Sequence, residues 1–176
     1  RTGVWIGIAA ITMSFAAYTS ALVVRQGAAP DWRHFRLPPI LYFNTLLLLA
    51  SSATLELGRR RVSREAAPRA ASELVHWLLL TLGLGLLFIA GQVSAWRDLA
   101  AQGLFLSTNP SSAFFYVLTG LHALHLLGGI IALGYVLGRL RSTAGPPIVA
   151  LDAVALYWHF MGVLWLYLML VLALRL

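Results

Sequence analysis

Residues 74–96 read LVHWLLLTLGLGLLFIAGQVSAW, a stretch that contains no Asp, Glu, Lys or Arg. An α-helix rises about 1.5 Å per residue, so about 20 apolar residues cross the hydrocarbon core of a bilayer, which is about 30 Å thick. Within lipid, a helix also satisfies its own backbone hydrogen bonds. The stretch therefore predicts a membrane-spanning helix.

Four further runs of the same kind lie on either side of this stretch. We predict transmembrane helices over about 4–24, 39–57, 74–96, 112–138 and 148–174. Only short connections remain, so residues 1–176 are predicted to form a single transmembrane domain. The expected fold class is an all-α integral membrane protein, a bundle of five transmembrane helices.

The composition restricts the classes of function. Of the 176 residues, 60% are hydrophobic and 11% are charged, against about 25% charged in an average soluble domain. The absence of cysteine excludes disulfides, thiolate metal sites and a cysteine nucleophile. The net charge of +7 comes from arginine alone, because the chain has no lysine. At helix ends, arginines favour anionic lipid headgroups rather than nucleic acid as partners.

Glycine and proline predict where the helices break. The sequence signals are Pro30, Pro38 and Pro39, then Gly58 and Pro68, then Asn109-Pro110, and finally Gly145-Pro146-Pro147. The first apolar run is too long for a signal peptide and lacks a small-residue cleavage site, so no signal peptide is expected.

The distribution of arginine predicts the orientation. With five spans, the N-terminus and the second and fourth connections share one side of the membrane. That side carries eight arginines: Arg1, Arg59, Arg60, Arg61, Arg64, Arg69, Arg139 and Arg141. The other side carries five: Arg25, Arg33, Arg36, Arg97 and Arg175. The positive-inside rule then predicts a cytoplasmic N-terminus and an external C-terminus.

Glu56 is a charged residue near the end of a predicted span, beside Arg59 and Arg60. Placing a charge at the bilayer centre costs about 2.5–3.5 kcal/mol on insertion scales, so a charged residue in a predicted span calls for a structural or functional explanation. We favour an interfacial carboxylate paired with arginine. A lipid-headgroup or proton-path role is the alternative.

The helix over 112–138 carries a polar face. Its members follow helical spacing: Ser112, Tyr116, Thr119, His122, His125 and Gly129. His122 and His125 could ligate haem or a metal ion, but a metal site usually requires three or four protein ligands. We favour two neutral histidines that hydrogen-bond across helices.

Other polar residues are explained by packing and hydrogen bonding. Asp152 and His159 share a face of the last helix, and Glu73 and His76 lie one turn apart near the start of the third. Two Gly-x-x-x-Gly pairs, Gly3 with Gly7 and Gly134 with Gly138, predict close helix contacts. The sequence offers no nucleophile–base motif, so neither a catalytic residue nor a metal ligand is assigned.

Two stretches resemble subunit III of the haem–copper terminal oxidases. Residues 114–129, FFYVLTGLHALHLLGG, are similar to the most recognisable segment of that family, and Tyr157-Trp158-His159-Phe160 is similar to its last helix. The pairs Asn44-Thr45 and Ser51-Ser52, together with Gln92 and Trp96, fit as well. The resemblance covers essentially the whole chain and points to the last five of the seven helices of longer members.

The resemblance implies a non-catalytic subunit that binds neither haem nor copper itself. It implies packing on subunit I, and on subunit II, of a hetero-oligomer that holds the haem and copper, in a bacterial-type inner (cell) membrane. It further implies bound phospholipid, support of proton uptake, and absence of the two-helix wing of longer members. The residues expected to bind lipid or to form structural polar contacts are Glu56, Arg59, Arg60, Glu73, His76, His122, His125 and His159.

The chain departs from the family pattern at carboxylates. Ala10-Ile11 stands where the family usually has Ser-Glu, Ala95 where it often has Glu, and Met161-Gly162 where it has Asp. Asp152 replaces a Glu. These departures favour a structural, lipid-binding role over a role in relaying protons.

Three alternatives stay open. One is the matching subunit of a quinol oxidase, or an accessory protein of nitric oxide reductase, because no residue identifies the electron donor. Another is a membrane b-type cytochrome that uses His76, His122, His125 and His159. A small transporter is the third, although the chain lacks an inverted repeat.

Overall fold

The computed structural model describes residues 2–28, 32, 34–62, 67–142 and 148–176. Over this part of the chain it contains five α-helices and no strand. The helices are α1 (Thr2–Ala28), α2 (Ile40–Val62), α3 (Ala67–Ala101), α4 (Pro110–Ser142) and α5 (Ile148–Arg175). All five are long and apolar enough to cross a membrane. The predicted fold class, an all-α multi-pass membrane protein, is confirmed.

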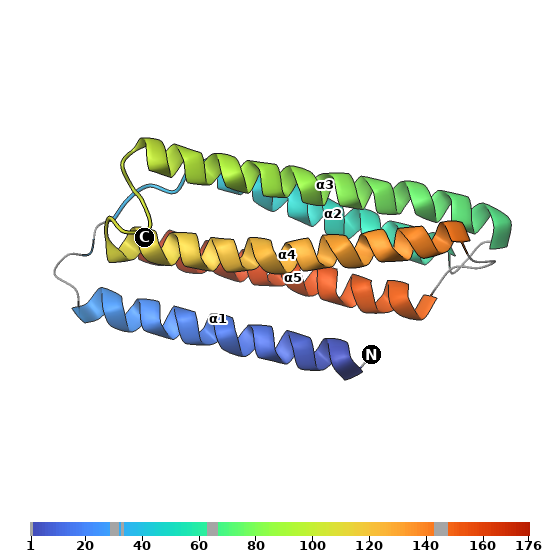
Figure 1. Ribbon diagram of the computed structural model, residues 1–176, viewed down its shortest axis with the longest axis horizontal. Helices are drawn as coiled ribbons and strands as arrows, with labels where there is room; N and C mark the ends of the chain where they lie inside the picture. The colour runs from blue at the N-terminus through green and yellow to red at the C-terminus, as the bar shows by residue number, and fades with distance from the viewer. Residues whose placement is uncertain (1, 29–31, 33, 63–66, 143–147) are drawn as a thin grey trace.

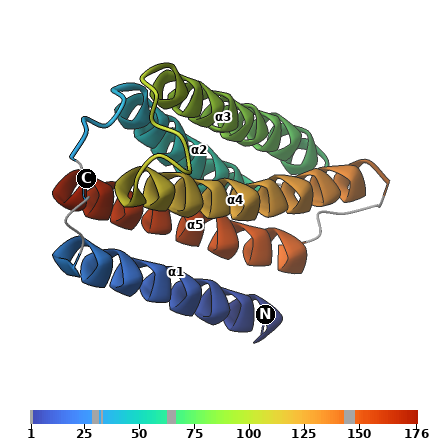
Figure 2. The same ribbon diagram turned by 60° about the vertical axis from the view of Figure 1, so that its left-hand side comes forward.

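Four of the helices form a closed ring, and the fifth lies outside it. In the ring, α2 packs on α3, α3 on α4, α4 on α5, and α5 on α2. Helix α1 touches only α4 and α5 and runs along their outer side (Figures 1 and 2). Of the 18 most apolar consecutive residues of α1 only 11% are buried, whereas 44% of the corresponding residues of α5 are buried.

Buried side chains recur at the spacing of a coiled coil. On α5, Leu151, Trp158, Trp165 and Leu172 are buried at intervals of seven residues. On α2, the same interval joins Leu41, Leu48 and Leu55. A strict seven-residue repeat keeps one seam of each helix against its neighbours at a small crossing angle. The core of the molecule is therefore a continuous column inside the ring of α2, α3, α4 and α5.

Helix α1 is attached through one line of side chains. Ile8, Phe15 and Leu22 are its buried residues, again seven apart. Large residues on its other faces, such as Met13 at 73% exposure, point away from the protein. Such faces are suited to lipid or to another subunit.

Most helices extend beyond the apolar runs that the sequence predicts. Hydropathy marks only the part within hydrocarbon, so it misses the polar turns at each end, as in α3, which begins at Ala67. Gly58 and Pro68 were expected to bracket the second connection, but Gly58 lies inside α2 and Pro68 in the first turn of α3. Proline is tolerated there because first-turn N–H groups have no helical partner.

Local signals explain the connection between α3 and α4. Gly103 has a φ of 76°, a left-handed conformation that glycine adopts without steric cost and that ends a helix. Before α4, Asn109 Oδ1 accepts a hydrogen bond of 2.9 Å from the N–H of Ser112, and Pro110 fills the first helical position.

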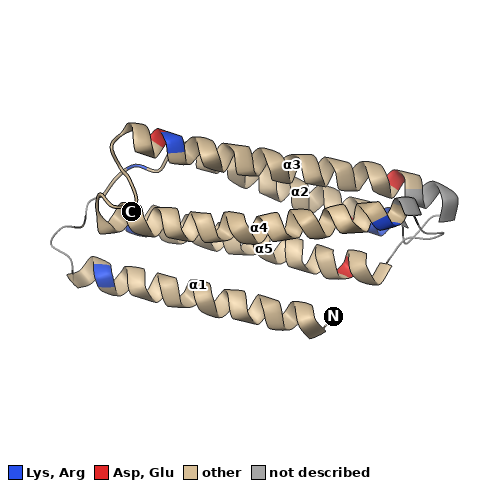
Figure 3. Cartoon of the chain, in the orientation of Figure 1, with Lys and Arg blue, Asp and Glu red and all other residues tan. Residues whose placement is uncertain are grey.

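Charged residues gather at the two ends of the bundle (Figure 3). The start of α1, the end of α2, the start of α3, the end of α4 and the start of α5 lie at one end of the bundle, and the opposite ends of these helices lie at the other (Figure 1). Of the residues used to predict orientation or breaks, several lie outside the described residues: Arg1, Pro30, Arg33, Arg64 and Gly145-Pro146-Pro147. The side chains of Arg69 and Arg141 are also outside the described set.

The glycines that permit close approach are different from the predicted ones. A Cβ built on Gly3, Gly7, Gly134 or Gly138 meets no atom within 4 Å, so neither predicted pair forms a close contact with the described part of the chain. A Cβ on Gly91 would instead overlap the side chain of Asn44.

Candidate functional site

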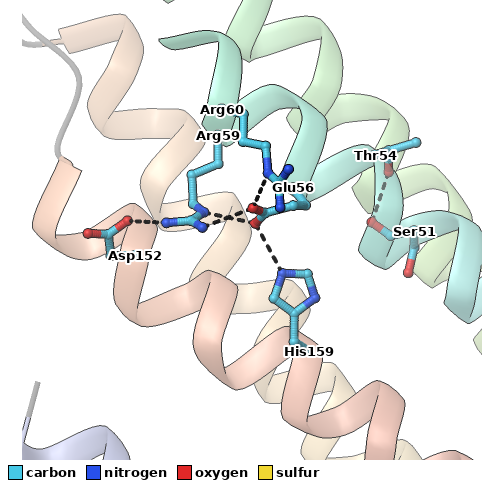
Figure 4. A network of polar contacts seen from close by, with 7 residues as sticks. All are labelled: Ser51, Thr54, Glu56, Arg59, Arg60, Asp152 and His159. Atoms are coloured by element: carbon cyan, nitrogen blue, oxygen red, sulfur yellow. Dashed lines mark hydrogen bonds and ion pairs between the residues drawn. The ribbon is translucent and has the colours of Figure 1, made fainter. Parts of the chain in front are cut away.

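A cluster of charged side chains joins α2 to α5 at the end of the bundle where α2 ends (Figure 4). Glu56 accepts hydrogen bonds from Arg59 Nε at 2.9 Å and Arg59 Nη2 at 3.0 Å. It also accepts a 2.6 Å hydrogen bond from Arg60 Nε. These residues are three and four positions apart, so helical geometry alone brings them together. The single carboxylate thus forms ion pairs with two neighbouring cations.

Helix α5 supplies the other half of this cluster. Asp152 Oδ1 lies 3.2 Å from Arg59 Nη1, and His159 Nε2 lies 3.5 Å from Glu56 Oε2. Asp152 and His159 are two turns apart and so point from α5 toward the same stretch of α2 (Figure 4). Arg59 therefore bridges two helices, and its side chain is 39% exposed against 67% for Arg60.

A second, smaller contact joins α2 to α3. Arg61 Nη1 lies 3.5 Å from Glu73 Oε2, and the guanidinium lies 5.1 Å from the centroid of the Trp77 ring. His76 is exposed and donates from Nδ1 to the carbonyl of Ser72 within its own helix. Glu73 thus belongs to the α2–α3 contact, His76 makes its hydrogen bond within α3, and neither joins the cluster around Glu56.

The histidines of α4 differ in surroundings. His122 is fully buried, with its ring 5.7 Å from that of Phe88 and 5.0 Å from that of Trp165. His125 donates from Nδ1 to the carbonyl of Leu121 and meets Phe15 of α1 edge-on.

The prediction that these two histidines hydrogen-bond across helices is wrong for His122, which has no hydrogen-bond partner among the described residues. The hydrogen bond that His125 makes from Nδ1 stays within α4. Residues three apart share one broad face of a helix but still differ in direction by about 60°, so His122 points into the ring of helices while His125 points toward α1.

Of the four histidines named for a haem, His76 is exposed on α3, and the other three point at different neighbours. His122 meets α3 and α5, His125 meets α1, and His159 meets α2. Among the described residues there is also no group of three or more His, Cys, Asp or Glu placed to hold a metal ion. The arrangement does not bring two of these imidazoles face to face.

Tryptophans of α3 and α5 tie the ring of helices together. Trp158 Nε1 donates to Ser51 Oγ and Trp165 Nε1 donates to Thr45 Oγ1, both at 3.0 Å and both from α5 to α2. Trp96 Nε1 donates to Thr119 Oγ1 at 3.0 Å, from α3 to α4. The sequence contains these residues in the family-like motifs, but nothing in it pairs them, because the pairing depends on which helices are neighbours.

Two apolar grooves separate α1 from the rest of the bundle. The first, of about 400 Å³, is lined by Gly3, Gly7, Gly128, Ala132 and Tyr157 among others. The second, of about 370 Å³, runs between Thr12 and Phe15 of α1 and Phe160 and Tyr167 of α5. In the first groove, Gly3 and Gly7 carry no side chain, so the space between α1 and its neighbours stays open there.

The fold and these contacts define a class: a multi-pass helical membrane protein in which tryptophans and an arginine connect neighbouring helices. The family model of cytochrome c oxidase subunit III matches residues 9–174. The chain belongs to this family, as the sequence resemblance indicated.

Individual relatives agree. The chain is 32% identical over 161 residues to a probable cytochrome c oxidase subunit 3 of Mycobacterium tuberculosis, covering 86% of this chain and 74% of that protein. A probable cytochrome c oxidase subunit 3 of Mycobacterium leprae is 34% identical over 164 residues, with the same coverages. The cytochrome c oxidase subunit 3 of Synechocystis is 28% identical over 171 residues, covering 93% and 70%. Membership of an oxidase complex with other subunits follows from the family.

Proposed function

We propose that this chain is a non-catalytic subunit of a respiratory haem–copper oxidase that stabilises the catalytic subunit I and holds lipid beside it. The family match over residues 9–174 carries the proposal. The internal hydrogen bonds support it, because the indole N–H groups of Trp158, Trp165 and Trp96 donate to hydroxyl groups of neighbouring helices, which is a structural role. In this proposal the haem and copper reside in the partner subunits.

Copurification tests the assembly. Affinity purification of the tagged full chain from mild detergent should yield subunits I and II with the haem spectrum of the oxidase. The haem should stay with those subunits when the chain is dissociated from them. A preparation that lacks a haem–copper subunit, or a haem that remains with this chain alone, would overturn the proposal.

Lipid is proposed to occupy the grooves beside α1. Their walls are apolar, and volumes of about 400 and 370 Å³ suit acyl chains. Arg59 and Arg60 lie at the bundle end where α1 begins, at a depth suited to a phosphate headgroup.

A substitution that fills the first groove tests lipid retention. A Cβ on Gly7 meets no atom within 4 Å, so Gly7→Leu should be accepted by the protein while its side chain occupies the groove. We expect native mass spectrometry of the purified complex to show fewer bound phospholipids. Ala9→Leu, on an exposed position of α1, is the control and should leave the lipid number unchanged. Equal lipid retention in both variants would contradict the proposal.

The orientation is proposed from the arginine distribution, with the N-terminus in the cytoplasm and the C-terminus outside a bacterial-type inner membrane. Arg59, Arg60, Arg61 and Arg139 support it, because all four lie toward the end of the bundle that holds the N-terminus. At that end they would face the anionic leaflet.

A further inference from the structure

Three polar side chains are buried inside the ring of helices without a hydrogen-bond partner among the described residues. Asn44 of α2, Gln92 of α3 and His122 of α4 are each 0% exposed. Both polar side-chain atoms of each residue are unpaired. Burying such a group without a hydrogen bond destabilises the folded protein, and surrounding lipid cannot supply the bond. Three together therefore require an explanation.

His122 contacts the ring of Trp165, and the other two side chains lie within about one helical turn of residues that contact this ring. His122 contacts Trp165 directly, with ring centroids 5.0 Å apart. Trp165 donates to Thr45, the residue after Asn44. Gln92 is one helical turn beyond Phe88, whose ring centroid is 4.8 Å from that of Trp165. All three unpaired groups thus belong to one layer of the core.

A glycine of α3 makes room for one of these polar side chains. Gly91, next to Gln92, lets the side chain of Asn44 rest against α3, because any Cβ there would overlap Asn44 Oδ1. A larger residue would push this polar group away from the layer. The glycine and the amide therefore form a matched pair.

The chemistry of the layer selects its ligand. Each amide offers donors and an acceptor, and a neutral imidazole offers one of each. The layer contains no carboxylate, and Glu56 lies about 18 Å farther along α2, so a bound cation would be left without a counter-charge. An apolar molecule would leave all the polar groups unpaired. Water both donates and accepts, carries no charge, and typically makes about three hydrogen bonds in such places.

We propose that Asn44, Gln92 and His122 bind buried water at the centre of the bundle. This water joins α2, α3 and α4 through hydrogen bonds that the side chains do not make with one another. It lies apart from the charged cluster around Arg59 and is independent of which oxidase the chain serves.

Solid-state NMR of the full chain in lipid bilayers tests the proposal. The sequence makes assignment simple, since Asn occurs only at 44 and 109 and Gln only at 26, 92 and 102. With ¹⁵N-labelled Asn, Gln, His and Trp, we expect cross-peaks between water and the side-chain amides of Asn44 and Gln92 and the ring of His122. The indole N–H of Trp158 is the control: it is equally buried but bonded to Ser51, and should show no water cross-peak.

Two results would overturn the proposal. One is a spectrum in which the three side chains contact each other and none contacts water. The other is a Gln92→Met variant whose remaining water cross-peaks, at Asn44 and His122, are as strong as before, because we expect them to weaken or vanish. If this variant does not fold, the spectrum of the unsubstituted chain decides alone.

Discussion

Arg59 is the residue on which the polar end of the bundle depends. Its guanidinium is shared between Glu56 of its own helix and Asp152 of α5. A planar group with five donors is suited to such a fork, which a lysine could not reproduce. Because the side chains involved are only partly exposed, solvent screens their interaction less than it would on an open surface. The single residue thus connects the end of α2 to the beginning of α5.

Substitution of Arg59 should lower the stability of the protein more than substitution of Arg60. Arg59→Ala removes the cation that pairs with Asp152 and one of the two that pair with Glu56. We therefore expect the free energy of unfolding to fall by about 1–2 kcal/mol, which lies between the usual values for exposed and buried ion pairs. Arg60→Ala removes one contact of a 67% exposed side chain and should cost less than about 1 kcal/mol. Thermal unfolding of the two variants in the same detergent measures the difference. Equal melting temperatures would show that the bridge to α5 contributes nothing.

At the scale of the element, small residues decide how closely two helices approach. Helices α2 and α3 pack along most of their length, and glycine occurs where a large or polar side chain crosses between them. Gly91 faces Asn44, and Gly58 faces Trp77. Lipid is as apolar as leucine, so close packing replaces the hydrophobic effect as the attraction between such helices.

The α2–α3 contact should therefore be sensitive to one added methyl group. Gly91→Ala places a Cβ against Asn44 Oδ1 and should lower stability by about 1–3 kcal/mol, the usual cost of overpacking. Gly83→Ala, on the same helix, meets no atom within 4 Å and should be neutral or slightly stabilising, because alanine favours helix. Unfolding titrations of both variants test the contrast. A Gly83→Ala variant as unstable as Gly91→Ala would point to a general intolerance of α3.

Sequence predicted the helices well and their contacts poorly. Each apolar run marks a helix, because the bilayer imposes one length and one period. The Gly3–Gly7 pair was expected to permit close packing, yet it faces a groove, since a glycine motif does not say which helix lies opposite. For the same reason Glu56 could be paired with Arg59 from spacing, whereas Asp152 could not: its contact requires α5 to lie beside α2.

For the molecule as a whole, the placement of connections fixes which residues share a side of the membrane. Ser72, near the start of α3, lies at the end that holds the N-terminus, and Gln102, after α3, lies at the end that holds the C-terminus (Figure 1). Both are exposed. Because the chain contains no cysteine, single cysteines at these positions give an unambiguous report.

Labelling should distinguish the two ends. In intact cells, a membrane-impermeant maleimide should react with Gln102→Cys and not with Ser72→Cys, because the arginine-rich end is proposed to face the cytoplasm. Permeabilised cells provide the control, in which both should react. The reverse pattern in intact cells would invert the proposed topology.

The attachment of α1 along the single line of Ile8, Phe15 and Leu22 has a mechanical consequence. A helix with so few buried residues has few contacts that fix its angle to its neighbours, so it can change its tilt while the ring of α2 to α5 keeps its packing. Tilting is one way in which a helix accommodates a bilayer thinner or thicker than its apolar length. Helix α1 is therefore the part of this chain best suited to adjust its own span to hydrophobic mismatch.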